Sequence, residues 1–324
     1  MKSYLGIDVG SVSTKLAVLD EDDELIAHIY QPTQGRPIEM VQEGLARIKE
    51  QLPAGVEISG VATTGSARYL AGVIVNADLV KNEITSHATA SLFYFPDVQT
   101  ILEIGGQDSK IIIVRDGIVT DFGMNTVCAA GTGSFLDHQA LRLNMTIEDF
   151  GKRAMESKAS VRIAGRCTVF AESDMIHKQQ IGHKTEDILY GLCQALVRNY
   201  VNNVALGKEI KSPIVFQGGV AFNQAIVKAF REELEADIIV PPHHELMGAI
   251  GAALLVHEEM TGDKRSKFNG FSVSREQYHT SSFECKACAN LCEIAQISVN
   301  NKVIARWGGR CDRWERVISE EATK

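Results

Sequence analysis

The 324-residue chain contains seven cysteines, and two of them lie in small-residue loops that could present a thiolate. Cys128 stands in NTVCAAGTG and Cys167 stands in GRCTVF, and each loop leads into a segment expected to be helical. Backbone N–H groups and the helix dipole stabilise a thiolate near a helix N-terminus, and small neighbours leave room for an iron–sulfur cluster. A free cysteine is equally well a buried, small apolar side chain. The residues alone therefore leave both interpretations open.

A second group of cysteines occurs towards the end of the sequence. Cys285, Cys288, Cys292 and Cys311 form a C-x2-C-x3-C run and one later thiol within 27 residues. Four thiolates suit tetrahedral Zn²⁺ or an iron–sulfur cluster. Zinc sites usually pair two C-x2-C units, and the missing second unit favours a [4Fe–4S] cluster, with zinc as the alternative. Core packing of all four, or disulfides in a reducing compartment, are weaker interpretations. Cys193 lies among apolar residues at helical spacing and is expected in the core.

Two copies of a strand–glycine–strand pattern carry the other candidate chemistry. The first is LGIDVGSVSTKLAVL and the second is ILEIGGQDSKIIIV, which begins at Ile101. Each predicts an apolar strand, a tight glycine turn, a second strand and then a third strand, at 25–29 and at 118–122. The repeat indicates two similar α/β domains that face one another. Aligned at an offset of 95 residues, the matched pairs are Asp8 with Glu103, Gly10 with Gly105 and Lys15 with Lys110.

Glycine turns of this kind can bind phosphate. The backbone approaches an anion closely where no side chain intervenes, and successive N–H groups form an anion-binding concavity. Asp8 and Glu103 could hold Mg²⁺ through water, since Mg²⁺ prefers one or two carboxylates together with phosphate oxygens. Asp8, Gln107 and Asp108 are the catalytic candidates, which would orient the attacking water and the metal ion. The candidate nucleotide contacts are Gly10, Ser11, Ser13, Thr14, Lys15, Glu103, Gly105, Gly106, Gln217, Gly218 and Gly219.

A third element distinguishes this pattern from an ordinary β-hairpin. The segment PIVFQGGVAFN predicts a buried strand that ends in Gly218 and Gly219 before a helix, where backbone could pack flat against an adenine ring. Neither a G-x-x-x-x-G-K-[ST] loop nor a G-x-G-x-x-G fingerprint between a strand and a helix is present. The two matched turns and the glycine segment together favour a nucleotide site of a different kind.

These segments resemble the superfamily of acetate kinases, sugar kinases, heat-shock chaperones and actin. Within it, the sequence resembles the activator components of 2-hydroxyacyl-CoA dehydratases and the ATPase subunits of benzoyl-CoA reductases, the BadF/BadG/BcrA/BcrD type. Glu103 departs from the aspartate expected before IGGQD, and its longer side chain could shift the geometry of the metal ion. The segments that carry the resemblance cover roughly residues 4–256 and are LGIDVGSVSTK, EIGGQDSK, NTVCAAGTGSFL, GRCTVFAESD and QGGVAFN.

The resemblance implies an α/β fold with two duplicated RNase H-like lobes, of the actin and sugar-kinase type, around a nucleotide cleft. The expected divisions are 1–96 for the first lobe, 97–260 for the second lobe with a helical cluster-binding insertion, and 261–324 for a small cysteine-rich module. A helix at 246–256 should pack against a counterpart near 83–92. Further helices are expected at 37–52, 132–143, 185–206 and 223–234.

The resemblance also implies an activity. It is that of an ATP-dependent iron–sulfur reductase (activase), which binds ATP or ADP and Mg²⁺ and couples hydrolysis to electron transfer in anaerobic metabolism. Low-potential electrons would pass to a partner iron–sulfur enzyme, such as a 2-hydroxyacyl-CoA dehydratase or a related double-cluster reductase. A homodimer would share one [4Fe–4S] cluster held by Cys128 and Cys167 of each subunit, with ferredoxin or flavodoxin as electron donor. An amino-sugar-type kinase or a nucleotide-switched assembly module are alternatives, but both leave these cysteines without a role.

Composition excludes other classes of protein. The net charge of −8 argues against a nucleic-acid-binding surface, because such surfaces are usually basic. No stretch approaches the ~20 apolar residues that a membrane-spanning helix needs. Asp8 interrupts the N-terminal segment where a signal peptide would continue its apolar region. We therefore expect a cytoplasmic protein without nucleic-acid or membrane partners.

Overall fold

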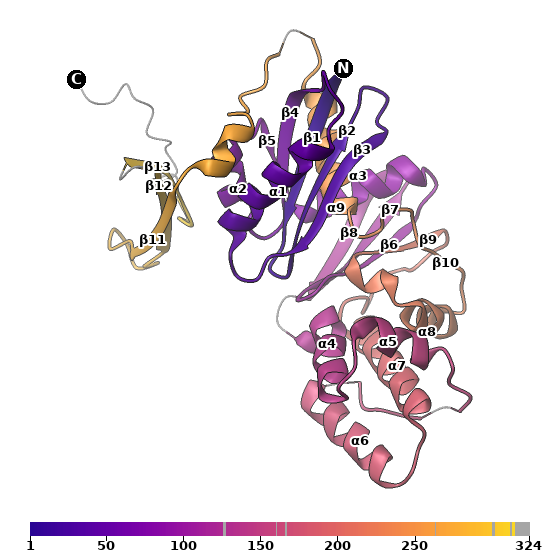
Figure 1. Cartoon of the computed structure of the whole chain (residues 1–324). Coiled ribbons are helices and arrows are strands. Elements are labelled where there is room, and N and C mark those ends of the chain that lie inside the picture. Colours follow the sequence, from indigo (N-terminus) through magenta and orange to yellow (C-terminus); the bar gives the residue numbers. More distant parts are fainter. Residues whose placement is uncertain are drawn as a thin grey trace, which may run out of the picture. The chain divides into compact units, whose positions relative to one another are not determined.

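The computed structural model describes residues 1–125, 128–159, 161–165, 167–262, 264–299, 302–311 and 313–314 (Figure 1). The chain divides into two compact units. The first contains Met1–Glu83 together with Ala252–Lys324, and the second contains Ile84–Gly251. Along the sequence, the second unit is therefore inserted into the first.

The first unit is built on a mixed five-stranded sheet. Its elements are β1 (Lys2–Val9), β2 (Ser13–Leu19), β3 (Leu25–Pro32), α1 (Pro37–Gln51), β4 (Glu57–Thr64), α2 (Arg68–Val75) and β5 (Leu79–Val80). The strand order is β3-β2-β1-β4-β5, with β1 antiparallel to β2 and parallel to β4. Successive side chains of a strand point to opposite faces. Leu5, Ile7 and Leu16 accordingly share one core cluster with Leu45 of α1 and Ile74 of α2.

The second unit repeats this sheet. Its strands are β6 (Thr100–Ile104), β7 (Ser109–Arg115), β8 (Ile118–Asn125), β9 (Ile214–Gln217) and β10 (Ile238–Ile239). Their order is β10-β9-β6-β7-β8, with β6 antiparallel to β7 and parallel to β9. Each element of the first sheet thus has a counterpart, from the central strand to the short edge strand. The repeat extends beyond the two turns that the sequence displays.

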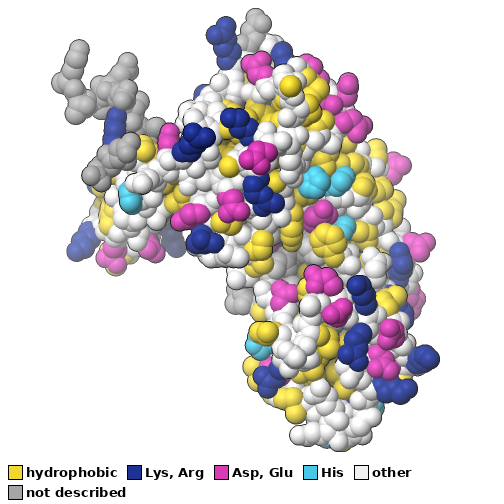
Figure 2. All heavy atoms as spheres, viewed as in Figure 1, with side chains coloured by type: hydrophobic (Ala, Val, Ile, Leu, Met, Phe, Trp, Pro, Cys, Tyr) yellow, Lys and Arg dark blue, Asp and Glu magenta, His cyan; other side chains and the backbone are white. Residues whose placement is uncertain are grey.

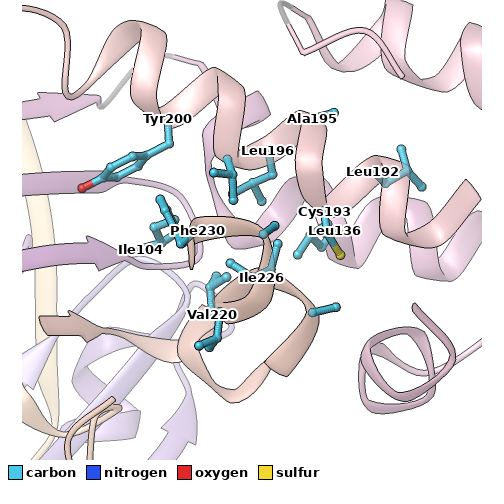
Figure 3. Close-up of a cluster of buried hydrophobic side chains, with 14 of the residues drawn as sticks. Ile104, Leu136, Leu192, Cys193, Ala195, Leu196, Tyr200, Val220, Ile226 and Phe230 are labelled. Carbon is cyan, nitrogen blue, oxygen red and sulfur yellow. The ribbon is translucent and has the colours of Figure 1, made fainter. Parts of the chain in front are cut away.

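Helices cover both faces of the second sheet. They are α3 (Glu83–Tyr94), α4 (Gly133–Arg142), α5 (Ile147–Ala154), α6 (Thr168–Gln180), α7 (Thr185–Asn203) and α8 (Gln224–Leu234). Helix α9 (Met247–Glu259) instead packs its residues Ala252 and Val256 against Tyr4 and Ala62 of the first sheet. Ala88 of α3 packs with Ile101 and Ile112 on one face. On the other face, Ile104 shares a core with Tyr200 of α7 and Phe230 of α8 (Figure 3). Helices α4 to α7 gather beside this sheet as a helical group (Figure 1).

The predicted regular elements are confirmed within a few residues at their ends. The helix expected at 37–52 is α1, and those expected at 132–143, 185–206, 223–234 and 246–256 are α4, α7, α8 and α9. The third strands of both repeats are β3 and β8. Cys193 is fully buried in the core of the second unit, as expected (Figure 3). Burial raises the pKa of this thiol far above its ordinary value, so it stays protonated and inert.

Helix α9 lies directly on α3. A Cβ atom added at Gly251 would collide with the backbone carbonyl of Ser86, so the two helices approach at this glycine more closely than a side chain permits. The expected packing of the glycine-containing helix against the 83–92 segment is confirmed.

The C-terminal segment packs on the first unit. It contains the short helix η3 (Phe271–Arg275) and an antiparallel sheet of β11 (Tyr278–Glu284), β12 (Glu293–Val299) and β13 (Lys302–Trp307), in the order β11-β12-β13. Val273, Ile297 and Ala305 belong to the same core cluster as Leu45 of α1. Gln42 of α1 donates its side-chain amide to the carbonyl of Val273 at 2.8 Å. The segment therefore shares part of its core with the first unit.

The described residues contain no helix that is both long enough and apolar enough to cross a membrane. Acidic and basic side chains alternate over the face drawn in Figure 2.

Candidate functional site

The first glycine turn joins β1 to β2. The backbone N–H of Gly10 donates to the carbonyl of Ser13 at 3.0 Å, which closes a tight turn. Asp8 lies at the end of β1 directly opposite Lys15 in the sheet, and Lys15 Nζ contacts Asp8 Oδ2 at 3.0 Å. Ser11 is exposed and Ser13 is half-buried. The turn therefore presents hydroxyl groups and backbone N–H groups beside a paired carboxylate.

Thr14 does not point to the side of the turn that presents these hydroxyl and N–H groups. In β2, Ser13 and Lys15 share one face and Thr14 lies on the other, because strand side chains alternate. Thr14 is fully buried, and its Oγ1 lies 2.9 Å from Thr33 Oγ1. Thr33 in turn donates to the carbonyl of Gly10 at 2.8 Å. Thr14 thus supports the turn from beneath, on the opposite side from the candidate phosphate contacts.

Gly65 lies against the end of β1 beside this turn and was not identified from the sequence. It follows β4 with φ of +93°, and a Cβ atom there would overlap the carbonyl of Val9 and the Asp8 carboxylate. The next residues hold it in place, since the N–H of Ala67 donates to the same Val9 carbonyl at 3.0 Å. The only sequence signal is a glycine after a buried strand, because the contact itself joins residues more than fifty positions apart.

The second turn joins β6 to β7 in the same way. The N–H of Gly105 donates to the carbonyl of Asp108 at 3.0 Å. Lys110 is almost completely buried and bridges two acids, with its Nζ 3.0 Å from Glu103 Oε2 and 2.9 Å from Asp108 Oδ1. Gln107 is exposed at the tip of the turn. The turn is therefore a more buried copy of the first, with a second carboxylate bound to its lysine.

Tyr200 of α7 supports the second turn from the core. Its hydroxyl donates to the carbonyl of Lys110 at 2.6 Å. Burial, with the nearby Glu103 carboxylate, raises the pKa of Tyr200 well above its ordinary value. The hydroxyl therefore remains a permanent donor beneath β7.

The third candidate element is the Gly218-Gly219 segment that follows β9. Gly218 has φ of +92°, and a Cβ atom there would overlap the carbonyl of Ile104 and the Glu103 carboxylate. This is the counterpart of Gly65 beside Asp8. The side chain of Gln217 is buried between helix residues of α3, with Ser91 donating to its Oε1 at 2.7 Å and His87 Nδ1 2.8 Å from its Nε2. The side chain of Gln217 therefore joins the end of β9 to α3.

His244 holds the other side of the glycine segment. Its carbonyl accepts the N–H of Gly218 at 2.9 Å, and its ring Nδ1 lies 3.1 Å from the Gly218 carbonyl. The exposed ring of Phe222 meets the His244 ring edge-on at a centroid distance of 4.4 Å. The His243–Glu245 stretch is therefore a loop that leads into α9.

Helix α4 begins on the second turn. The backbone N–H groups of Gly133 and Ser134 donate to the carbonyls of Gly105 and Gly106 at 2.9 and 2.8 Å. The Ser134 hydroxyl donates to the Gly106 carbonyl as well. The first N–H groups of an isolated helix have no partners, and the second glycine turn thus binds two of them in α4. Cys128 precedes this helix by five residues, so one short segment joins the turn to the first cysteine.

The two cysteine loops of the second unit lie side by side. Cys128 is exposed and precedes the 3-10 turn η1 (Ala129–Gly131), while Cys167 is half-buried at the N-terminus of α6. Cys167 and Ala130 line one small apolar hollow, together with Phe135, Ala164, Gly165, Ala171 and Ala195. Thr126, Val127 and Arg166 lie outside the described residues. Small side chains therefore surround Cys167 on this side, and Ala130 brings the Cys128 loop to the same hollow.

Asn199 of α7 links the two loops and was not identified from the sequence. It is buried, and its Nδ2 donates to the carbonyl of Gly165 at 2.6 Å. A Cβ atom added at Gly131 would lie 2.9 Å from Asn199 Oδ1, so the same amide contacts the loop that carries Cys128. A polar residue within an amphipathic helix gives no signal of such a role.

Exposed apolar side chains flank both cysteines. Val169 and Phe170 stand two and three residues after Cys167 and are each 66% exposed. Phe122 and Met124 of β8 precede Cys128 and are also exposed. Large apolar groups exposed close together are typical of a protein–protein contact.

The C-terminal cysteines lie at one end of the third sheet. Cys285 is buried, Cys292 is half-buried, and Cys288 and Cys311 are exposed. Trp314 Nε1 donates to Cys285 Sγ at 3.2 Å, and this bond lowers the pKa of the thiol, together with the Ala287 backbone N–H and nearby Arg313. Within the described residues, no three His, Cys, Asp or Glu side chains already stand close enough to bind a metal ion.

Comparison with known proteins decides the family. Residues 5–256 match the BadF/BadG/BcrA/BcrD ATPase family. The chain belongs to this family. The (R)-2-hydroxyglutaryl-CoA dehydratase activating ATPase of Acidaminococcus fermentans is 35% identical over 265 residues, which cover 79% of this chain and 97% of that protein. The 2-hydroxyisocaproyl-CoA dehydratase activator of Clostridioides difficile is 33% identical over 266 residues, covering 79% and 95%.

Solved structures support the same family. Component A of the A. fermentans dehydratase matches with a TM-score of 0.75 at 32% identity, covering 81% of this chain and all of that one. The C. difficile activator with bound ADPNP matches with a TM-score of 0.71 at 33% identity, covering 80% and 95%. A ROK-family glucokinase of Streptomyces griseus, in complex with glucose and AMPPNP, has a TM-score of 0.50 at 12% identity over 79% of this chain and 99% of that chain. That likeness shows the fold alone, and it agrees with the expected actin and sugar-kinase type of mixed α/β fold.

Proposed function

We propose that this BadF/BadG/BcrA/BcrD-family ATPase is an ATP-dependent activator that delivers single low-potential electrons to a partner iron–sulfur enzyme. The partner is of the 2-hydroxyacyl-CoA dehydratase class or a related double-cluster reductase, and ferredoxin or flavodoxin supplies the electrons. The A. fermentans and C. difficile relatives, which are dehydratase activators, support this assignment. The glycine turns and Gly218-Gly219 are the proposed contacts for ATP and ADP.

Each part of the nucleotide machinery has a separate role in this proposal. The N–H groups of Gly10, Gly105 and Gly106 and the hydroxyls of Ser11 and Ser13 bind phosphate oxygens. Asp8 and Glu103 would hold Mg²⁺ through water, and Gln107 and Asp108 would orient the attacking water. Phosphoryl transfer of this kind needs positioning and charge neutralisation, and no covalent intermediate with the protein.

The residues around Cys128 and Cys167 fit an iron–sulfur cluster shared by two copies of the chain. Cys128 is exposed and Cys167 is half-buried, their loops meet at an apolar hollow lined mostly by small side chains, and exposed apolar residues lie near both in the sequence. A [4Fe–4S] cluster takes four thiolates, and a two-fold dimer supplies two from each chain. Such a cluster, when bound, stores and passes one electron.

The observation that carries the proposal is the docking of α4 on the second turn. Because Gly105 and Gly106 bind the first N–H groups of α4, a phosphate that repositions this turn also moves the start of the helix. Cys128 lies just upstream on the same segment. Two backbone hydrogen bonds thus join the turn that we propose binds phosphate to the segment that carries Cys128.

Two measurements test the proposal. Cys128→Ser and Cys167→Ser should each remove about four irons per dimer and the matching visible absorbance after anaerobic purification, while MgATP binding persists. Cys193→Ala, which changes a thiol in the core, should keep the iron. Full iron content in either serine variant would disprove the cluster assignment.

The coupling itself is tested by hydrogen–deuterium exchange at residues 128–142. ADPNP with Mg²⁺ should change exchange of this segment in the parent chain and not in Asp8→Asn. Unchanged exchange in a parent that demonstrably binds the nucleotide would refute the link through α4.

A further inference from the structure

The turn between β11 and β12 brings three C-terminal cysteines together. The strand pairing ends with Glu284 opposite Glu293, which places Cys285 opposite Cys292. The N–H of Cys285 donates to the carbonyl of Cys292 at 2.7 Å. Cys288 lies in the loop between them, and its carbonyl accepts the N–H of Leu291 at 3.3 Å. One short hairpin therefore holds all three thiols at the same end of the sheet.

The fourth cysteine arrives at this end from the neighbouring strand. In β13, Trp307 pairs with Ala295 of β12, so the chain leaves the sheet beside the start of β12. Gly308 has φ of +99°, and a Cβ atom there would overlap the carbonyl of Glu293. This conformation, which favours glycine, turns the chain towards Cys311, two residues beyond Gly309. All four thiols thus lie beyond the same end of a three-stranded sheet.

The sulfur of Cys285 also has a directional N–H donor. Trp314 Nε1 donates to Cys285 Sγ at 3.2 Å, and the Trp314 ring meets Phe283 edge-on at 5.0 Å. Arg306 lies 5.3 Å from the centre of the same ring. N–H groups that point at sulfur are the contacts that hold and tune metal-bound thiolates. These contacts of the Trp314 ring hold its N–H group directed at the sulfur of Cys285.

We propose that Cys285, Cys288, Cys292 and Cys311 bind one thiophilic metal centre, a [4Fe–4S] cluster, at this end of the third sheet. The unequal spacing of the C-x2-C-x3-C run favours the cluster over a zinc site built from two matched C-x2-C units. Cys288 and Cys311 are exposed, so their side chains can turn towards Cys285 and Cys292 without disturbing a core. None of these residues is among those proposed to bind nucleotide or the shared cluster.

The proposal is tested on the full chain that already carries Cys128→Ser and Cys167→Ser, so that metal at the first pair of cysteines does not contribute. Adding Cys288→Ser and Cys311→Ser removes two exposed thiols and no buried side chain. Ala287→Ser, in the same loop, is the control. Iron, acid-labile sulfide and zinc are measured after anaerobic purification.

The four-serine chain should lose about four irons and four sulfides per chain, and the Ala287→Ser control should keep them. A loss of about one zinc per chain would retain the four-thiolate site and overturn its assignment as a cluster. Equal metal content in both chains would overturn the site altogether. So would a Cys285–Cys292 disulfide, detected by mass spectrometry of the protein as purified.

Tryptophan fluorescence gives a second readout that is specific to this site. The chain has two tryptophans, Trp307 and Trp314, and both belong to the C-terminal segment. Removal of the metal by a chelator should change their emission in the Cys128→Ser, Cys167→Ser chain and leave it unchanged in the four-serine chain. Emission that responds equally in both chains would overturn the placement of the metal beside Trp314.

Discussion

Replacement of Lys110 by methionine tests the buried charge network of the second turn. The Nζ of Lys110 lies 3.0 Å from Glu103 and 2.9 Å from Asp108, and the lysine side chain is 2% exposed. At an effective dielectric constant of about 20, each contact contributes about 5 to 6 kcal/mol of Coulomb attraction. Desolvation of the three ions offsets most of that gain, so the intact network adds far less to stability than these attractions suggest.

Removing the Lys110 cation alone should cost more stability than the intact network contributes. Lys110→Met keeps much of the volume but leaves the buried Glu103 carboxylate and Asp108 without their shared partner. Loss of one member of a buried pair typically costs about 3–5 kcal/mol. We expect Lys110→Met to lower the free energy needed to open the second sheet by this amount. Lys208→Met is the matched control, since Lys208 pairs with the more exposed Asp121 and should cost at most about 1 kcal/mol.

Hydrogen–deuterium exchange of the β6–β7 peptides gives the appropriate measurement, because it reports opening of this sheet and not of the other unit. Faster exchange in Lys110→Met, and near-parent exchange in Lys208→Met, would support the reasoning. If both variants opened with the same free energy, the buried ion pairs would not hold the turn and the assigned role of Lys110 would be wrong.

Three further predictions concern the nucleotide turns, Tyr200 and a buried carboxylate, Asp187. Asp8→Asn and Asp108→Ala should each lower MgATP hydrolysis severely in a phosphate-release assay, and normal turnover in both would move the active site elsewhere. Tyr200→Phe should cost about 1–2 kcal/mol in urea unfolding followed by circular dichroism, since the Lys110 carbonyl loses its buried donor; an unchanged midpoint would contradict this. The pKa of Asp187 is held below its ordinary 3.8 by backbone N–H groups and the Ser157 hydroxyl. The ionised carboxylate therefore stabilises the fold fully above pH 3.8, and this contribution is lost as the pH falls through the folded pKa. The difference in free energy of unfolding between the parent chain and Asp187→Ala should therefore become smaller as the pH falls below 3.8.

The repeated strands and turns were predictable because they depend on local signals. Short apolar runs on both sides of Gly10 and Gly105 specify strand, turn and strand within about fifteen residues. Helix α1 likewise follows from apolar spacing after Pro37, which is favourable in a first helical turn. Ends differ by a few residues, because the last turn of a helix depends on its partners as much as on its own sequence.

The missed residues depend on contacts between distant parts of the chain. Gly65 and Gly218 resemble ordinary loop glycines until the sheet places each beside the acid of the central strand. Asn199 acquires its role only when α7 passes beneath both cysteine loops. Thr14 was grouped with Ser13 by sequence proximity, whereas strand alternation separates them once the start of β2 is known.

The insertion of the second unit into the first has a consequence for synthesis on the ribosome. The strands of the first sheet emerge early, but Ala252–Lys324, which completes that unit, emerges only after Ile84–Gly251 has been made. At about 5–20 residues per second, this delay lasts about ten to thirty seconds. During that interval, the faces of α1 and α2 that later receive Val273, Ile297 and Ala305 have no partner. The nascent first unit is therefore the part of this chain that should bind a chaperone longest, and the inserted unit should become protease-resistant before it.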